Sequence, residues 1–283
     1  SSGWRHSCAV LRTGAVQCWG VDPSDVFAVA ASSRRSAPVV VNGISNAIGI
    51  SAGFSHACAA LSSGQVQCWG DNYYGQLGNG STTSSLNPVL VKGISSATSV
   101  SAGGLYTCAV LRSGAVQCWG TNSSGELGNG SKIRSAVPVT VNGISTATSV
   151  SAVGSTTCAV LRSGGVQCWG SNLSGKLGNG STDNSSTPVS VSGITSAIAV
   201  SAGNSSACAV LNSGQVQCWG SNSGGRLGND TLTDSSTPVM VSSINSATSV
   251  SVGDDQTCAL LSSGAVRCWG GTYVPQPGND PAT

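Results

Sequence analysis

The chain has 283 residues, of which only 8% are charged, and its formal net charge is +2. Because no stripe of Lys and Arg is present to neutralise phosphates, these values argue against a nucleic-acid partner. The apolar runs are too short to span a bilayer, and no signal peptide is visible at the start of the sequence.

The cysteines mark an internal repeat. One series recurs every 50 residues, at positions 8, 58, 108, 158, 208 and 258. A second series, at 18, 68, 118, 168, 218 and 268, precedes Trp-Gly each time, and together the two series account for all 12 cysteines. A fixed period of this length indicates one supersecondary unit stacked repeatedly. We therefore treat residues 1–283 as a single domain of six copies.

The third copy, residues 97–146, shows the plan of the unit. Four strand patterns follow one another at residues 98–102, 107–111, 115–119 and 137–141, and no stretch has helical spacing. Arg112-Ser113-Gly114 connects the second and third strands, with glycine where a three-residue hairpin loop needs a left-handed conformation. The same glycine recurs in every copy, so each unit should contain this hairpin.

The hairpin determines which residues face each other. With three residues in the loop, Val110 faces Val116 and Cys108 faces Cys118, at a Cα separation of roughly 4.5–5.5 Å that a disulfide accepts. The sequence therefore predicts six bridges and an oxidising compartment, extracellular or at the cell surface. The alternatives are buried thiols or a metal site, although no C-x-x-C motif and only two histidines are present. The predicted pairs are Cys8–Cys18, Cys58–Cys68, Cys108–Cys118, Cys158–Cys168, Cys208–Cys218 and Cys258–Cys268.

Two further residue types recur on the strands. The tryptophan after each second-series cysteine is expected to pack sheet against sheet rather than to form a ligand-binding ring. A Pro-Val-x-Val motif places proline in the fourth strand at positions 38, 88, 138, 188 and 238. Because proline is tolerated at a sheet edge, we expect the fourth strand to be the outer one.

The repeat length selects the architecture. Six four-stranded sheets of one plan can stack radially into a propeller or linearly into a solenoid. Four antiparallel strands in a period of 50 residues favour an all-β propeller of six blades.

One recurring string also carries a family resemblance. It reads Ser-x-Gly-x-x-x-x-Cys-Ala-x-Leu-x-Ser-Gly-x-Val-x-Cys-Trp-Gly-x-Asn-x-x-Gly-x-Leu-Gly-Asn-Gly and is fullest in copies two to five. The string resembles the regulator of chromosome condensation (RCC1-like) repeat family. The resemblance implies a β-propeller, usually of seven blades, that works as a protein-binding platform. Members secreted by bacteria, which include β-lactamase inhibitors, suit the paired cysteines better than the nuclear member that activates a small GTPase.

Copies one and six depart from this pattern. Residues 21–36 replace the Leu-Gly-Asn-Gly stretch in copy one, copy six has no Pro-Val-x-Val motif, and residues 1–3 are the tail of a first strand. We therefore expect a propeller that closes with six blades, is incomplete, or is closed by another segment or chain.

The loops vary most among the copies. The loop between the first and second strands, called the first loop, should emerge on one rim in all six copies, and three of these loops carry an aromatic residue. These aromatics are either interface anchors or plugs of the central channel. His6 and His56 share one position in adjacent copies, so they either hold a shared ligand or are incidental. The loop between the third and fourth strands, the third loop, is a second variable set. The candidate partner-binding residues are Trp4, Arg5, His6, Phe54, His56, Leu105, Tyr106, Asp254 and Asp255 in first loops, with Tyr73 and Tyr74 in a third loop.

The sequence contains no enzyme signature. Asp254-Asp255 has no general acid or nucleophile beside it, and no P-loop, H-E-x-x-H or G-x-S-x-G motif occurs. We therefore expect no catalytic residues, no cofactor and no metal site. The sequence favours a secreted, disulfide-stabilised propeller that binds another protein or a glycan through one rim. The alternative is a structural subunit of an extracellular assembly, filament or surface layer that self-associates through unpaired edge strands.

Overall fold

The computed structural model describes residues 1–4, 6–20 and 35–271, and the predicted partner-binding residue Arg5 lies outside this part of the chain. The described residues form antiparallel β-sheets with 3-10 turns at Leu173–Gly175 and Ser223–Gly225. Among them, no helix has the length and apolar character needed to span a membrane. The strands are β1 (His6–Val10), β2 (Val16–Gly20), β3 (Arg35–Val40), β4 (Ala47–Ala52), β5 (His56–Leu61), β6 (Val66–Gly70), β7 (Ser85–Leu90), β8 (Ala97–Ala102), β9 (Tyr106–Leu111), β10 (Val116–Gly120), β11 (Ser135–Thr140), β12 (Ala147–Val153), β13 (Thr156–Leu161), β14 (Val166–Gly170), β15 (Ser185–Ser190), β16 (Ala197–Ala202), β17 (Ser206–Leu211), β18 (Val216–Gly220), β19 (Ser235–Met240), β20 (Ala247–Val252), β21 (Gln256–Leu261) and β22 (Val266–Gly270).

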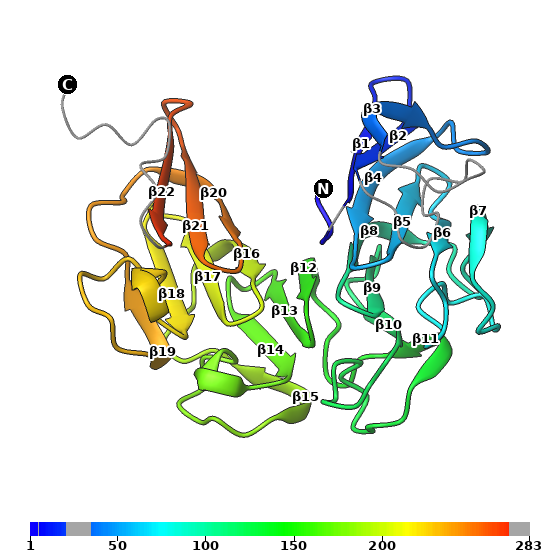
Figure 1. Cartoon of the computed structure of the whole chain (residues 1–283). Helices are drawn as coiled ribbons and strands as arrows, with labels where there is room; N and C mark the ends of the chain where they lie inside the picture. Colours follow the sequence, from blue (N-terminus) through cyan, green and yellow to red (C-terminus); the bar gives the residue numbers. More distant parts are fainter. Residues whose placement is uncertain (5, 21–34, 272–283) are drawn as a thin grey trace.

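Each repeat forms one sheet, and the sheets are arranged as blades around a common axis (Figure 1). The first strands β4, β8, β12, β16 and β20 lie side by side at the centre. The fourth strands β7, β11, β15 and β19, which carry the prolines, are the outer strands of their sheets. The predicted six-bladed all-β propeller and the predicted place of the fourth strand are both confirmed.

The hairpin sets the register as predicted. Gly114 has a φ of +88°, and the Leu111 N–H donates to the Ala115 oxygen at 2.8 Å. Cys108 therefore pairs with Cys118, with a Cα–Cα distance of 4.0 Å. All six predicted disulfides are present.

The outer strand of each blade begins earlier than the sequence pattern suggests. In blade three the expected strand is 137–141, whereas β11 spans Ser135–Thr140. The reason is a register shift after Cys118, which lets Gly120 pair with Ser135. Two steps on β10 thus correspond to four on β11, and such an irregularity cannot be read from alternation alone.

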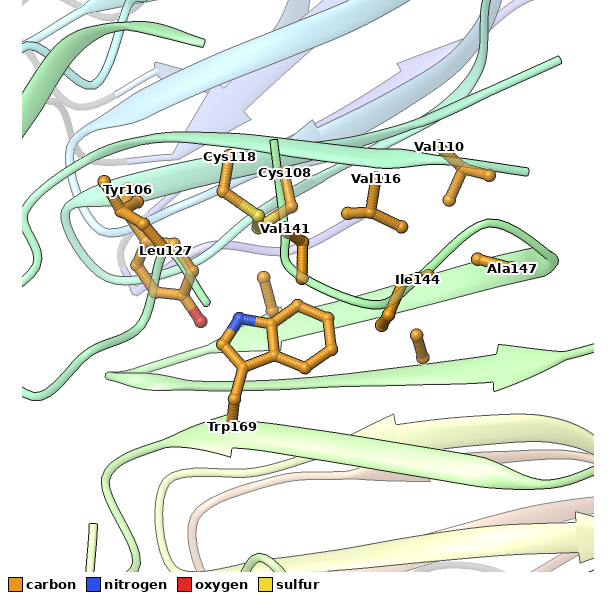
Figure 2. Packing of buried hydrophobic residues seen from close by; sticks show 12 residues of the cluster. Tyr106, Cys108, Val110, Val116, Cys118, Leu127, Val141, Ile144, Ala147 and Trp169 are labelled. Atoms are coloured by element: carbon orange, nitrogen blue, oxygen red, sulfur yellow. A yellow bond between two sulfur atoms is a disulfide. The ribbon is translucent and has the colours of Figure 1, made fainter. Parts of the chain in front are cut away.

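The tryptophans join neighbouring blades. Figure 2 shows the Trp169 indole of blade four lying against the disulfide of blade three and against Val141 and Ile144. The ring is fully buried, and its Nε1 donates to the Glu126 oxygen at 2.8 Å. The same bond runs from Trp119 to the Gln76 oxygen and from Trp219 to the Lys176 oxygen, both at 2.9 Å. The structure therefore supports the packing interpretation of this series.

The first and last blades differ from the other four. Blades two to five have four strands, whereas the described parts of blade one (β1–β3) and blade six (β20–β22) have three. In blade one, Ser2 bridges to Ser7 and so provides a short counterpart of a first strand. Val266 on blade six is 59% exposed, while its equivalent Val216 is fully buried. In the described structure no further blade covers this face, so the arc of blades is open there (Figure 1).

Candidate functional site

The first loops of the blades and the third loops of blades two to five emerge on one side of the propeller, which we call the loop face. They share a side because the first and third strands both run antiparallel to the second strand, as in blade three. The two kinds of loop also touch. The Thr121 N–H donates to the Leu105 oxygen at 3.0 Å, and the Ser171 N–H donates to the Ser155 oxygen at 2.9 Å.

Backbone hydrogen bonds link neighbouring first loops around the axis. The Phe54 N–H donates to the Gly104 oxygen at 3.2 Å, and the Gly104 N–H donates to the Gly154 oxygen at 3.0 Å. In blade three the backbone approaches a side chain closely, because a Cβ on Gly103 would clash with the ring of Tyr106. Backbone bonds thus link the first loops of blades two, three and four.

The first loops of all six blades enclose a pocket of about 260 Å³ at the axis, which we call the axial pocket. Much of its lining is glycine and alanine. Blades one and two contribute the side chains of Trp4 and Phe54, and blades five and six contribute Asn204 and Asp254. The Asn204 Nδ2 donates to Oδ1 of Asp254. An aromatic wall and a carboxylate therefore line one small cavity.

Two aromatic pairs lie on the loop face, each with one exposed and one half-buried ring. Trp4 is 64% exposed, and its ring centroid lies 6.1 Å from that of Phe54. Tyr73 is 66% exposed and meets Tyr74 edge to face at 5.0 Å. The structure thus places all four of these predicted residues on the face expected for a partner, and one pair also lines the axial pocket.

Three predicted rim residues are instead buried beneath the loop face. Tyr106 is fully buried, and its hydroxyl donates to the Thr156 oxygen at 2.6 Å. His6 and His56 occupy the same strand position in blades one and two and are 3% and 0% exposed. The expectation that these side chains are exposed is wrong. Each lies two residues before the first cysteine of its blade, and residues two apart on a strand share a face.

The two histidines belong to the core. The His56 Nε2 lies 2.9 Å from Oγ1 of Thr107 in the next blade. Burial lowers the pKa of both His6 and His56 to about 4, so both rings are neutral at pH 7. The described residues include no group of three or more His, Cys, Asp or Glu that could hold a metal ion.

The acidic pair of blade six is exposed, and its two members have different surroundings. Arg226 of blade five anchors this loop: its Nη1 donates to the Asp254 backbone oxygen at 2.6 Å, and its Nη2 lies 3.2 Å from Oδ1 of Asp255. The Asp255 carboxylate is therefore paired, whereas Asp254 lines the axial pocket.

Leu105 lies beside a second pocket of the loop face, of about 310 Å³, which Phe54 and Lys176 also line. The Lys176 Nζ donates to the Asn204 backbone oxygen at 2.9 Å. Burial lowers the pKa of Lys176 to about 8. The half-buried Leu105 is thus placed on the loop face, as predicted, but outside the axial pocket.

One buried position under the loop face is absent from the predicted site. It is the variable residue of the Gly-x-Leu-Gly motif in the third loop, occupied by Gln76, Glu126, Lys176 and Arg226. Lys176 and Arg226 both hold the first loop of the following blade. The sequence does mark this position, because it varies inside an otherwise constant motif. A variable position is, however, usually interpreted as an exposed one.

Comparison with known families gives one result. Two family models, both described as the regulator of chromosome condensation (RCC1) repeat, match the chain. The first matches residues 63–110, 113–160, 163–210 and 213–260. The second matches residues 1–23, 47–76, 97–126, 147–176 and 197–226. No curated protein matches the sequence.

Solved structures share the fold at low sequence identity. Human WBSCR16 superposes with a TM-score of 0.84 at 19% identity, covering 95% of this chain and 74% of that one. Yeast RCC1 (Prp20), solved bound to Kap60, gives a TM-score of 0.83 at 16% identity, covering 95% and 69%. The ectodomain of the Arabidopsis thaliana receptor kinase ACR4 gives a TM-score of 0.56 at 20% identity, covering 96% and 80%.

Proposed function

Because the chain belongs to the regulator of chromosome condensation repeat family, we propose that it is a binding platform rather than an enzyme, and that it recognises another protein through its loop face. The observation that carries this proposal is the pair of aromatic contacts, Trp4–Phe54 and Tyr73–Tyr74, on that face. Aromatic side chains of this size are the commonest anchors of protein interfaces, because they bury much area with few rotatable bonds.

Solved structures of the same fold support a protein partner. Yeast RCC1 (Prp20) has been solved bound to Kap60, and a second Prp20p structure is described together with its binding properties to Gsp1p and histones. Two further structures are receptor-kinase ectodomains, from Arabidopsis thaliana and Physcomitrella patens. These proteins show what a propeller of this kind does elsewhere, and a binding role for this chain is consistent with them.

The disulfides indicate the environment in which the platform works. Six bridges, one in each blade, suit an oxidising compartment. We infer that the protein acts outside the cell or at its surface. Because the chain has few charges, it attracts a partner only weakly over long distances, so recognition should depend on short-range aromatic and polar contacts.

Partner capture with matched variants tests the proposal. The double variant Trp4→Ala/Phe54→Ala removes one aromatic pair, and Arg112→Ala/Arg162→Ala changes two residues at hairpin turns on the opposite face. Extracellular proteins of the source organism are passed over each immobilised variant and quantified by mass spectrometry. We expect the loop-face variant to lose about tenfold or more of a partner that the control variant retains. Retention by the loop-face variant and loss by the control would refute the proposal.

Blade six provides an observation in favour of the structural alternative. Among the described residues, β22 has no partner strand on its outer edge, and a pocket of about 940 Å³ lined by Leu232 and Trp269 adjoins it. Such an edge can accept a strand from another chain and so build an assembly. Size-exclusion light scattering over a range of concentrations tests this. An average molar mass that rises with concentration in the unaltered protein but not in Val266→Lys would support assembly. The mass of a single chain at every concentration would exclude it.

A further inference from the structure

Many of the backbone N–H groups that line the axial pocket are already used in hydrogen bonds, which reduces the number of donors that the pocket offers a ligand. The Ala52 N–H donates to Oγ of Ser1 at 3.1 Å, and the Ala102 N–H donates to Oγ of Ser51 at 2.9 Å. Four lining glycines donate within their own blades: Gly3 to the His6 oxygen, Gly53 to His56, Gly103 to Tyr106 and Gly253 to Gln256, at 2.8–2.9 Å. The Phe54 N–H is likewise used by the Gly104 oxygen. A ligand that only donates therefore suits the pocket better than one that must also accept.

The pocket also carries a negative charge that no described cation neutralises. Asp254 is the ionisable residue among its described lining, and its carboxylate accepts a hydrogen bond from the neutral amide of Asn204. Arg226 reaches the backbone oxygen of Asp254, but its ion pair is with the carboxylate of Asp255. The carboxylate of Asp254 is thus available to a cationic ligand.

The aromatic wall complements this charge. Trp4 and Phe54 line the same cavity, with their rings tilted at 45° to each other. A cation over an aromatic face is attracted by the quadrupole of the ring, most strongly for tryptophan, and a planar guanidinium also stacks on it. At about 260 Å³ the pocket is smaller than the roughly 300–1,000 Å³ of pockets that hold drug-sized ligands, so it suits a single side chain.

We propose that the axial pocket binds one arginine side chain of the partner, with the guanidinium stacked on Trp4 and paired with the carboxylate of Asp254. Arginine meets all three conditions: it has five N–H donors and no acceptor, it keeps its charge, and it is planar. A neutral sugar meets fewer of these conditions, because it brings no charge to the carboxylate of Asp254 and its hydroxyls also accept hydrogen bonds. This inference rests on the proposed function, since it names the group of the partner that the loop face receives.

Titration with small probes tests the assignment on the intact protein. Isotope-labelled protein is titrated with N-acetyl-L-arginine amide and followed by NMR at the backbone amides and tryptophan indoles. The matched probes are N-acetyl-L-glutamine amide, which is uncharged, N-acetyl-L-lysine amide, which is not planar, and methyl β-glucoside. We expect saturable shifts around Gly53, Gly103 and Asn204, with a dissociation constant on the order of 1 mM for so small a ligand. The arginine probe should bind more tightly than the other three.

Matched variants locate the contact. Asp254→Asn and Trp4→Ala should each weaken binding of the arginine probe about tenfold, through the lost charge-assisted bond and the lost cation–π contact. Asp183→Asn and Leu173→Ala, which change an acidic and an apolar residue outside the pocket, should alter it less than about twofold. All four side chains are exposed, so their replacement leaves the fold intact.

The outcomes separate this inference from the proposed function. Three results would overturn the arginine assignment. They are equal affinity for the glutamine or glucoside probe, an unchanged affinity of Asp254→Asn for the arginine probe, and the absence of saturable binding. If Trp4→Ala/Phe54→Ala nevertheless loses its captured protein, the binding platform stands with another ligand group. If the arginine probe binds as expected but capture does not depend on the pocket, the assignment to a partner side chain is wrong.

Discussion

The contact between a third-loop glycine and the tryptophan of the next blade yields a quantitative prediction. A Cβ on Gly78 would lie 2.6 Å from Nε1 of Trp119, and Gly78 has a φ of +67°. Gly93 provides the matched control, because its φ is +76° and a Cβ there would meet no atom within 4 Å. Alanine at either position therefore imposes similar backbone strain, but only Gly78→Ala also creates a steric clash.

The two costs can be estimated separately. Holding alanine in the left-handed region costs about 1–2 kcal/mol at either position. The clash adds about 1–3 kcal/mol for Gly78→Ala, as overpacking of a core does. Trp119 cannot move aside easily, since it is fully buried and its Nε1 donates to the Gln76 oxygen at 2.9 Å. We expect a loss of about 1–2 kcal/mol for Gly93→Ala and about 2–5 kcal/mol for Gly78→Ala.

Guanidinium denaturation of the oxidised protein, followed by tryptophan fluorescence, measures both losses. The difference between the two variants isolates the contact between blades, because the strain of the left-handed backbone cancels. Equal losses would show that the blades shift to admit the extra methyl group. In that case the idea of a rigid tryptophan contact between blades would have to be given up.

Four other predictions concern buried ionisable groups and disulfides. Burial lowers the pKa of His56 to about 4, so the unfolded state takes up a proton on this residue before the folded state does as the pH falls. The free energy of unfolding should therefore drop between pH 6.5 and 4, by up to roughly 3 kcal/mol from this residue. His56→Gln should flatten the dependence of the free energy of unfolding on pH in this range. Burial raises the pKa of Glu126, so the ionised carboxylate destabilises the fold at neutral pH. Glu126→Gln should therefore raise the free energy of unfolding at pH 7, and this gain should shrink as the pH falls. A gain that does not change with pH would show that the pKa of Glu126 is not raised. Replacing Cys108 and Cys118 together by alanine should cost about 3 kcal/mol at most without changing the blade, as circular dichroism and denaturation would show, because the hairpin is already paired around them. Dithiothreitol should reduce Cys258–Cys268 before the other bridges, since blade six leaves it only half-buried, and mass spectrometry after alkylation would reveal a different order.

The sequence predicted the blade because its key restraints are local. Gly114 and the three-residue turn determine the register of one hairpin, and the facing positions of Cys108 and Cys118 follow from that register. Repetition then extends one argument to six blades. The β-bulge at Gly120 was not predictable, since it depends on how the third loop returns to the sheet.

The candidate site was predicted less well because burial between blades is not a local property. Tyr106 seemed to belong to a loop, yet its place two residues before Cys108 puts it on the face that packs against the next blade. Glu126 and Lys176 occupy a variable position, and variability usually indicates exposure. Here each copy satisfies its own buried side chain differently, for example by the bond from Lys176 to the Asn204 oxygen. The partner of Lys176 lies in another blade, whereas Glu126 accepts a hydrogen bond from the Ser124 N–H of its own loop.

The backbone bonds between neighbouring first loops have a consequence for how this molecule can evolve. Because Phe54 and Gly104 are joined through main-chain N–H and carbonyl groups, exchanging the half-buried side chain at position 54 removes none of these bonds. New specificities can therefore arise at the centre of the loop face without the loss of stability that usually accompanies a change of binding site. This freedom applies to the first loops that the backbone links, in blades two to four, whereas those of blades five and six are also held by the side chains of Lys176 and Arg226.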